Sequence, residues 1–135
     1  MANLICVPPE DVWKIWPGKV SVLIDAAYAA NDQFLPPTIL DELRAGTKLL
    51  WLAIDGKDTI VAAMLTALYP MRSGKMCKMM ECGGEHLEDW KHMRSQIEEY
   101  AKAEGCVRVM CEGRPGWAKV LSDYQMIGVI MEKRI

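Results

Sequence analysis

The stretch KMCKMMECGGEHLEDWKHMRSQIEEYAKAEGCVRVMC, residues 75–111, decides the fold. It reads as a strand over 75–82, a Gly83-Gly84 turn, a long amphipathic helix that ends at Gly105 and a second strand over 107–111. Because a helix of about five turns separates the two strands, they are predicted to run parallel, joined by a right-handed crossover. Many α/β proteins bind ligands at the carboxyl end of such strands.

Two β-rich runs, 49–54 and 59–69, precede this unit and are joined by Asp55-Gly56-Lys57-Asp58, a strong hairpin signal. A second loop, rich in Pro and Gly, leads into 75–82. The short loops allow only hairpins, so these three strands are predicted to form an antiparallel meander.

The remaining elements follow from apolar spacing and from Pro and Gly breakers. They are a first strand, three N-terminal helices, a short helix and a closing strand, predicted over 3–7, 9–16, 20–30, 39–45, 117–122 and 126–134. The fold class is therefore α/β, with a mixed, mostly antiparallel sheet that contains one parallel strand pair and is flanked by helices. Trp90, Ile97 and Tyr100 should face this sheet, and all five tryptophans are expected to pack in the core rather than form a stacking platform.

The composition restricts the class of protein. The chain has 135 residues, of which 51% are hydrophobic, and a formal net charge of -2. This length suits one domain over residues 1–135, and the charge gives no basic surface for nucleic acid. No apolar run is long enough to cross a membrane and no secretion leader is visible, which predicts a cytoplasmic protein with five reduced cysteines.

Two segments point to a family. Gly105-Cys106-Val107-Arg108-Val109 belongs to the second parallel strand, and the distinctive run Gly113-Arg114-Pro115-Gly116-Trp117 precedes the short helix and the last strand. With the order of the elements, they resemble the GCN5-related N-acetyltransferase (GNAT) fold, and are most similar to small GNAT-like proteins of phages and prophages. The resemblance covers roughly residues 48–135.

The resemblance implies acetyl-coenzyme A as cofactor, held between the two parallel strands, with its pyrophosphate on the amides that start the next helix. The implied cofactor-binding residues are Cys82, Gly83, Gly84, His86 and Arg114. Arg114 could equally fix a turn by donating hydrogen bonds to carbonyls. The expected phosphate-binding window, 85–90, carries three carboxylates in place of glycines, at Glu85, Glu88 and Asp89. These repel a diphosphate, so coenzyme A is expected to bind weakly.

Two residues are candidates for catalysis. Glu81, near the end of the strand before the turn, could deprotonate an amine if burial raises its pKa; the alternative is a solvated charge at a strand end. Tyr124 is the nearest tyrosine to the position of the family's acid, although the favoured register places Leu121 there. No metal is expected, because Cys82 and His86 lack zinc-ligand spacing.

The sequence thus favours acyl-coenzyme-A-dependent N-acyl transfer to a small-molecule or protein amine. The alternative is a non-catalytic phage or prophage binding protein, associated with a virion or with the host cytoplasm. The state of the phosphate-binding window distinguishes the two. The oligomeric state is left open.

Overall fold

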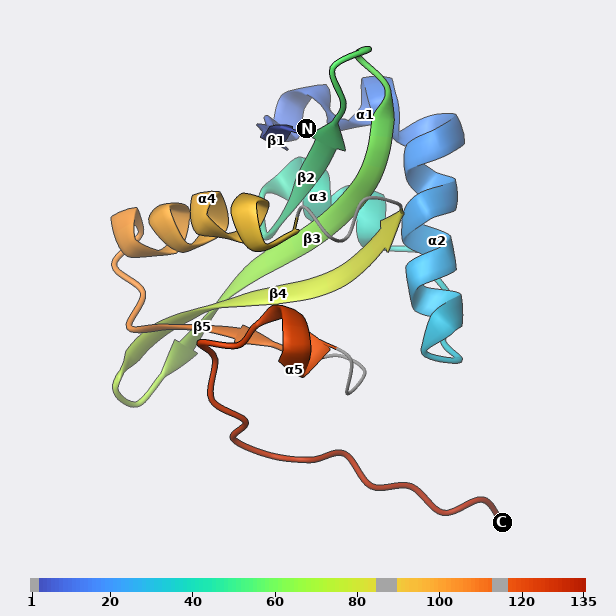
Figure 1. Ribbon diagram of the computed structural model, residues 1–135. Coiled ribbons are helices and arrows are strands. Elements are labelled where there is room, and N and C mark those ends of the chain that lie inside the picture. Colours follow the sequence, from blue (N-terminus) through green and yellow to red (C-terminus); the bar gives the residue numbers. More distant parts are fainter. Residues whose placement is uncertain (1–2, 85–89, 113–116) are drawn as a thin grey trace.

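The computed structural model of the chain describes residues 3–84, 90–112 and 117–135, and it contains a five-stranded mixed sheet (Figure 1). The strands lie in the order of the sequence, and only the last two neighbours run parallel. They are β1 (Asn3–Val7), β2 (Lys48–Ile54), β3 (Ile60–Met71), β4 (Gly74–Gly84) and β5 (Arg108–Cys111). The predicted meander, the parallel pair and the fold class are confirmed.

The hairpin between β2 and β3 forms for the reason that its sequence indicates. The Asp55 carboxylate accepts hydrogen bonds from the backbone N–H groups of Lys57 and Thr59, at 2.9 and 3.0 Å. Asp58 adopts a φ of 59°, which Asp tolerates better than most residues. The Asp55 side chain therefore satisfies two backbone N–H groups within the turn.

One face of the sheet is covered by the N-terminal helices η1 (Pro9–Asp11), α1 (Val12–Ile15), η2 (Trp16–Val20), α2 (Ser21–Ala30) and α3 (Ile39–Ala45). Helical geometry breaks inside η2, at Pro17 and Gly18, as the Pro-Gly pair predicts. Leu50 and Leu52 of β2 point to this face, where they pack with side chains such as Ile24 in one buried cluster.

The opposite face carries α4 (Trp90–Ala103) and α5 (Trp117–Val120). Ile97 is 0% exposed, and the Tyr100 ring meets the Trp51 ring edge to face, with centroids 5.4 Å apart. The predicted inward orientation of Ile97 and Tyr100 is thus confirmed. The side chain of Trp90 lies outside the described residues.

One predicted turn is wrong: Gly83 and Gly84 continue β4 and pair with β3 instead of ending the strand.

Two further predictions are wrong. Trp13 is 55% exposed, because α1 is a single turn that directs Val12 rather than Trp13 into the core. The predicted closing strand over 126–134 is absent: residues 125–135 have no regular structure and lead away from the body (Figure 1). Their β propensity alone does not form a strand without a paired neighbour.

Candidate functional site

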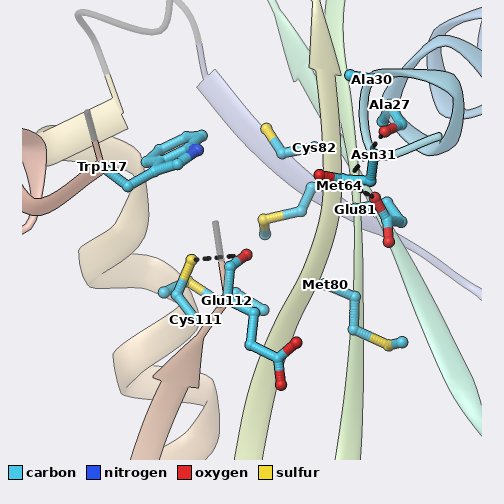
Figure 2. Close-up of a pocket in the computed structure, with 11 residues that line it drawn as sticks. Ala27, Ala30, Asn31, Met64, Met80, Glu81, Cys82, Cys111, Glu112 and Trp117 are labelled. Carbon is cyan, nitrogen blue, oxygen red and sulfur yellow. Dashed lines mark hydrogen bonds between the residues drawn. The ribbon is translucent and has the colours of Figure 1, made fainter. Parts of the chain in front are cut away.

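The two parallel strands separate before β4 ends. Their pairing stops at Met79 opposite Cys111, whereas β4 continues to Gly84 while paired with β3 on its other side. A small cavity of about 50 Å³ lies where the strands diverge. Its lining comes from α2, β3, β4, the end of β5 and α5, and consists of Ala27, Ala30, Asn31, Met64, Met79, Met80, Glu81, Cys82, Cys111, Glu112 and Trp117 (Figure 2).

A β-bulge shapes the β4 side of this cavity. Thr66 of β3 pairs with Met79, but Met64 pairs with Cys82, so β4 contains one residue more than β3 between these pairs. Met79 and Cys82 consequently pack on the α4 side of the sheet although they are three positions apart. The extra residue interrupts the alternation of side chains at Met80 and Glu81, next to the cavity.

The carboxyl end of β4 lies directly against α2. A Cβ atom on Gly83 would stand 2.3 Å from the backbone oxygen of Leu23, and one on Gly84 would stand 2.3 Å from that of Val61. Both positions therefore require glycine for close packing, and Gly84 also has a φ of +132°. The cofactor role predicted for these glycines remains a prediction; the close contact that Gly83 permits brings α2, and with it Asn31, to the cavity.

Glu81 and Asn31 lie on one side of the cavity (Figure 2). The Asn31 amide, at the end of α2, donates a hydrogen bond of 3.2 Å to the Glu81 carboxylate. Burial raises the pKa of the Glu81 carboxyl and the Glu112 charge adds to this effect, while the Asn31 hydrogen bond and the Lys78 charge oppose it. Glu81 thus has the raised pKa that its predicted role requires.

Cys111, Glu112 and Trp117 form the other side (Figure 2). The Glu112 carboxylate forms an ion pair with Lys78 on β4, at 3.0 Å. This ion pair joins β4 to the end of β5 next to the cavity. Glu81 and Glu112 therefore both line one small space, and the Glu112 carboxylate is paired with Lys78.

The thiols at the site are held in their neutral form. Burial raises the pKa of Cys82 to about 12 and also raises that of Cys111. A thiolate is the reactive nucleophile and metal ligand, so these cysteines act here as apolar lining. No group of three metal-ligating side chains occurs within residues 3–84, 90–112 and 117–135.

The structure places Tyr124 elsewhere. Its hydroxyl donates a hydrogen bond to the Glu98 carboxylate on α4, and Arg94 lies over its ring, 5.5 Å from the centroid. Burial and this hydrogen bond raise the pKa of Tyr124. Tyr124 is not among the residues that line the cavity, so the structure does not bring the two predicted catalytic residues together.

The other predicted binding residues, His86 and Arg114, and the three acids of the phosphate-binding window lie outside the described residues. Sequence reasoning missed Asn31 and Glu112. Glu112 could have been found, because it directly follows β5 just as Glu81 stands near the end of β4, and the carboxyl ends of neighbouring parallel strands meet. Asn31 carries no comparable signal, since only the packing of α2 on Gly83 brings it close.

The sequence matches no protein-family model and no curated protein. Solved structures are similar over nearly the whole chain. An aminoglycoside acetyltransferase, meta-AAC0020 from an uncultured soil metagenomic sample, is 9% identical with a TM-score of 0.70 and covers 99% of this chain and 96% of its own. A predicted acetyltransferase with acetyl-CoA from Clostridium acetobutylicum is 13% identical, with a TM-score of 0.66 and the same two coverages.

A ribosomal-protein-alanine N-acetyltransferase from Brucella melitensis is 11% identical with a TM-score of 0.63, and covers 100% of this chain and 96% of its own. At these identities the likeness is one of fold: the chain has the fold of GNAT acetyltransferases. The narrower resemblance to phage and prophage proteins stays a prediction. Among the described residues, no helix is long and apolar enough to span a membrane.

Proposed function

We propose that this protein transfers an acyl group from acyl-coenzyme A to a cationic amine, at the cavity between the diverging ends of β4 and β5. The observation that carries the proposal is the position of Glu81. A carboxylate with a raised pKa lines a cavity at the opening of the parallel strand pair, on a fold shared with acetyltransferases.

The cavity suits the acyl end of such a cofactor. A volume of about 50 Å³ has room for a few heavy atoms, given that one water needs roughly 10–15 Å³. Met64, Met79 and Cys82 provide an apolar wall that an acetyl methyl group can contact. Acyl-coenzyme A supplies the activated thioester. The residues predicted to hold its remaining parts are Gly83, Gly84, His86 and Arg114, and the three acids at 85–90 are expected to weaken that binding.

Glu81 provides the base. An amine is protonated at neutral pH and must lose a proton before its lone pair can attack a carbonyl carbon. The Glu81 carboxylate accepts that proton, and its raised pKa makes it a stronger base than an exposed glutamate. Asn31 orients the carboxylate through its hydrogen bond, which leaves the second oxygen available to the substrate.

Glu112 favours a cationic acceptor. Two carboxylates at one cavity attract a positively charged amine and disfavour an anionic substrate. The acceptor class proposed is therefore a primary amine, carried by a small molecule or by a protein.

The test is acetyl transfer from acetyl-coenzyme A to a panel of primary amines, with the acetylated product measured by mass spectrometry. Glu81→Gln should lower kcat/KM by about 10²-fold or more, the usual contribution of a positioned base. Glu10→Gln is the matched control, since Glu10 is exposed on η1, and it should leave the rate unchanged. In the parent the rate should fall on the acid side with a midpoint above 4.5, the ordinary pKa of this carboxyl, and Glu81→Gln should lack this limb.

The alternative is a non-catalytic binding protein of phage or prophage origin, favoured by the acidic window at Glu85, Glu88 and Asp89. It predicts no transfer to any amine. It also predicts no coenzyme A binding by calorimetry, even in a variant in which Arg, Gly and Gly replace the three acids. Transfer that is weak in the parent and stronger in that variant would exclude the alternative.

A further inference from the structure

A groove lies where the β3–β4 hairpin meets the connection from α4 to β5 (Figure 1). Its volume is about 470 Å³, within the range of roughly 300–1,000 Å³ that is typical of ligand pockets. Its lining consists of Leu68, Tyr69, Pro70, Gly74, Lys75 and Gly105, and shares no residue with the cavity at Glu81. Lys75 and Glu81 stand near opposite ends of β4, about 20 Å apart at roughly 3.3 Å per residue.

The two walls of the groove are fixed to each other. The backbone N–H of Val107 donates a hydrogen bond of 2.8 Å to the Lys75 carbonyl, which joins the α4–β5 connection to the hairpin. A Cβ atom on Gly74 would stand 3.0 Å from a methyl carbon of Val107, so Val107 packs directly on the hairpin backbone. The Val107 side chain is nevertheless 56% exposed and adds apolar surface next to the groove. A groove that is formed in advance loses little entropy when a partner binds.

The groove is bordered by positive charge, although the formal net charge of the chain is -2. Residues 59–80, which include all of β3 and most of β4, contain no Asp or Glu. Cationic side chains stand on the hairpin, in the last turn of α4 and at the start of β5: Arg72, Lys75, Lys102 and Arg108. None of the four forms an ion pair with another residue of 3–84, 90–112 or 117–135. These charges are therefore available to an anionic partner.

The backbone places these cations next to the groove. Arg72 is exposed in the hairpin turn, two positions before Gly74, and Lys75 belongs to the lining itself. Lys102 is exposed at the end of α4, where its carbonyl accepts a hydrogen bond of 3.0 Å from the Gly105 N–H. Positive charge thus borders the groove from more than one side.

We propose that this groove binds an acidic segment of a partner protein, whose carboxylates meet the four cations while an apolar side chain contacts Leu68 and Pro70. Cations on three separate elements suit several carboxylates along an extended segment better than one small anion. A nucleic acid fits less well, because stacking of successive bases needs several exposed aromatic rings and Tyr69 is the single aromatic residue of the lining. The inference is independent of the proposed acyl transfer, which uses the other end of β4.

The first test is fluorescence anisotropy of the full chain with three short fluorescein-labelled peptides. One alternates glutamate with leucine, one lysine with leucine and one glutamate with serine. The glutamate–leucine peptide should bind with a dissociation constant of about 10–100 μM, and the other two about tenfold more weakly or worse. Its binding should weaken as salt rises from about 0.05 to about 0.5 M, because exposed charges are screened. Equal binding of the lysine–leucine peptide, or no saturable binding of the glutamate–leucine peptide below about 1 mM, would overturn the proposal.

Charge reversal locates the binding site on the protein. Arg72→Glu and Lys75→Glu should each weaken binding of the glutamate–leucine peptide by about fivefold or more, since an attraction becomes a repulsion. The matched control is Lys57→Glu, the same charge change in the exposed turn of the other hairpin, and it should leave the affinity unchanged. Arg72 is exposed in a turn, so its replacement should not alter thermal unfolding. Unchanged affinity in both groove variants would refute the assignment.

The contact itself is observed by titrating the ¹⁵N-labelled full chain with the glutamate–leucine peptide. The amide signals of Gly74, Gly105 and Val107 should shift in proportion to saturation, and that of Lys57 should not. Shifts confined to other parts of the chain would place the peptide outside the groove and overturn the proposal. Displacement of the peptide by an oligouridylate at a lower concentration than by unlabelled peptide would assign the groove to nucleic acid instead, which would also overturn it.

Discussion

Strand β4 is paired with its two neighbouring strands over different lengths. It pairs with β3 from the loop at Gly74 to the last residue at Gly84, interrupted by one bulge, but with β5 only as far as Met79. On the β3 side the strand is closed by backbone hydrogen bonds; on the β5 side its residues Met79 to Cys82 line a cavity together with Glu112. The fully paired edge and the proposed site thus lie on opposite edges of one strand.

The difference in packing between the core and the C-terminal segment is largest for two isoleucines. Ile97, 0% exposed against the closed part of the sheet, should cost about 2–5 kcal/mol of unfolding free energy when changed to Ala. Ile130, 85% exposed in the segment that follows α5, should cost less than about 0.5 kcal/mol when changed in the same way. Denaturant unfolding measures both; equal costs would show that the segment is packed within one chain.

Disturbing the contact between β4 and α2 should have the next largest effect on stability. Gly83→Ala places a Cβ atom 2.3 Å from the Leu23 backbone oxygen, and backbone cannot move aside as a side chain can. We expect a loss of about 1–3 kcal/mol or more, the usual cost of overpacking. Gly56→Ala is the control, because no atom lies within 4 Å of its Cβ position, and it should be nearly neutral. A neutral Gly83→Ala would mean that α2 does not lie on β4.

Tyr124→Phe tests the contact between Tyr124 and α4. It removes the hydrogen bond from the hydroxyl to Glu98, which should cost about 1 kcal/mol or somewhat more since the acceptor is charged. Because Tyr124 does not line the cavity, kcat/KM for acyl transfer should stay within about twofold of the parent. A loss of about 10²-fold in kcat with unchanged thermal stability would instead restore Tyr124 as the acid.

The smallest expected effect is the dependence of stability on pH. Burial raises the folded-state pKa of Glu81 above 4.5, so ionised Glu81 lowers stability above that raised pKa, and this cost disappears below the ordinary value. The stability of Glu81→Gln relative to the parent should therefore increase as the pH rises from about 4 to about 7. The comparison is made by thermal unfolding at both pH values, and a relative gain at the acid end would contradict the sign of the shift.

The meander and the parallel pair could be predicted because they depend on local signals: hairpin loops of fixed length and one long helix. Glu81 could be selected from its place near a strand end. The bulge, the approach of α2 to Gly83 and the position of Asn31 could not, because each results from contacts between separate segments, such as the hydrogen bond that joins Asn31 and Glu81 across 50 residues. The prediction of a closing strand was wrong for a similar reason. A strand needs a paired neighbour, and the local pattern does not show whether its own chain provides one.

The bulge in β4 makes the site depend on the length of the strand as well as on its composition. A scan of single substitutions would score Met80 as a replaceable apolar residue. Deleting it instead would leave one residue, Glu81, opposite Leu65, and would shift that carboxylate from the position in which it accepts the Asn31 hydrogen bond. An insertion or deletion in this strand should therefore impair the proposed activity more than a replacement of Met80 does, and variants of this fold should tolerate changes of residue at Met80 far better than changes of residue number.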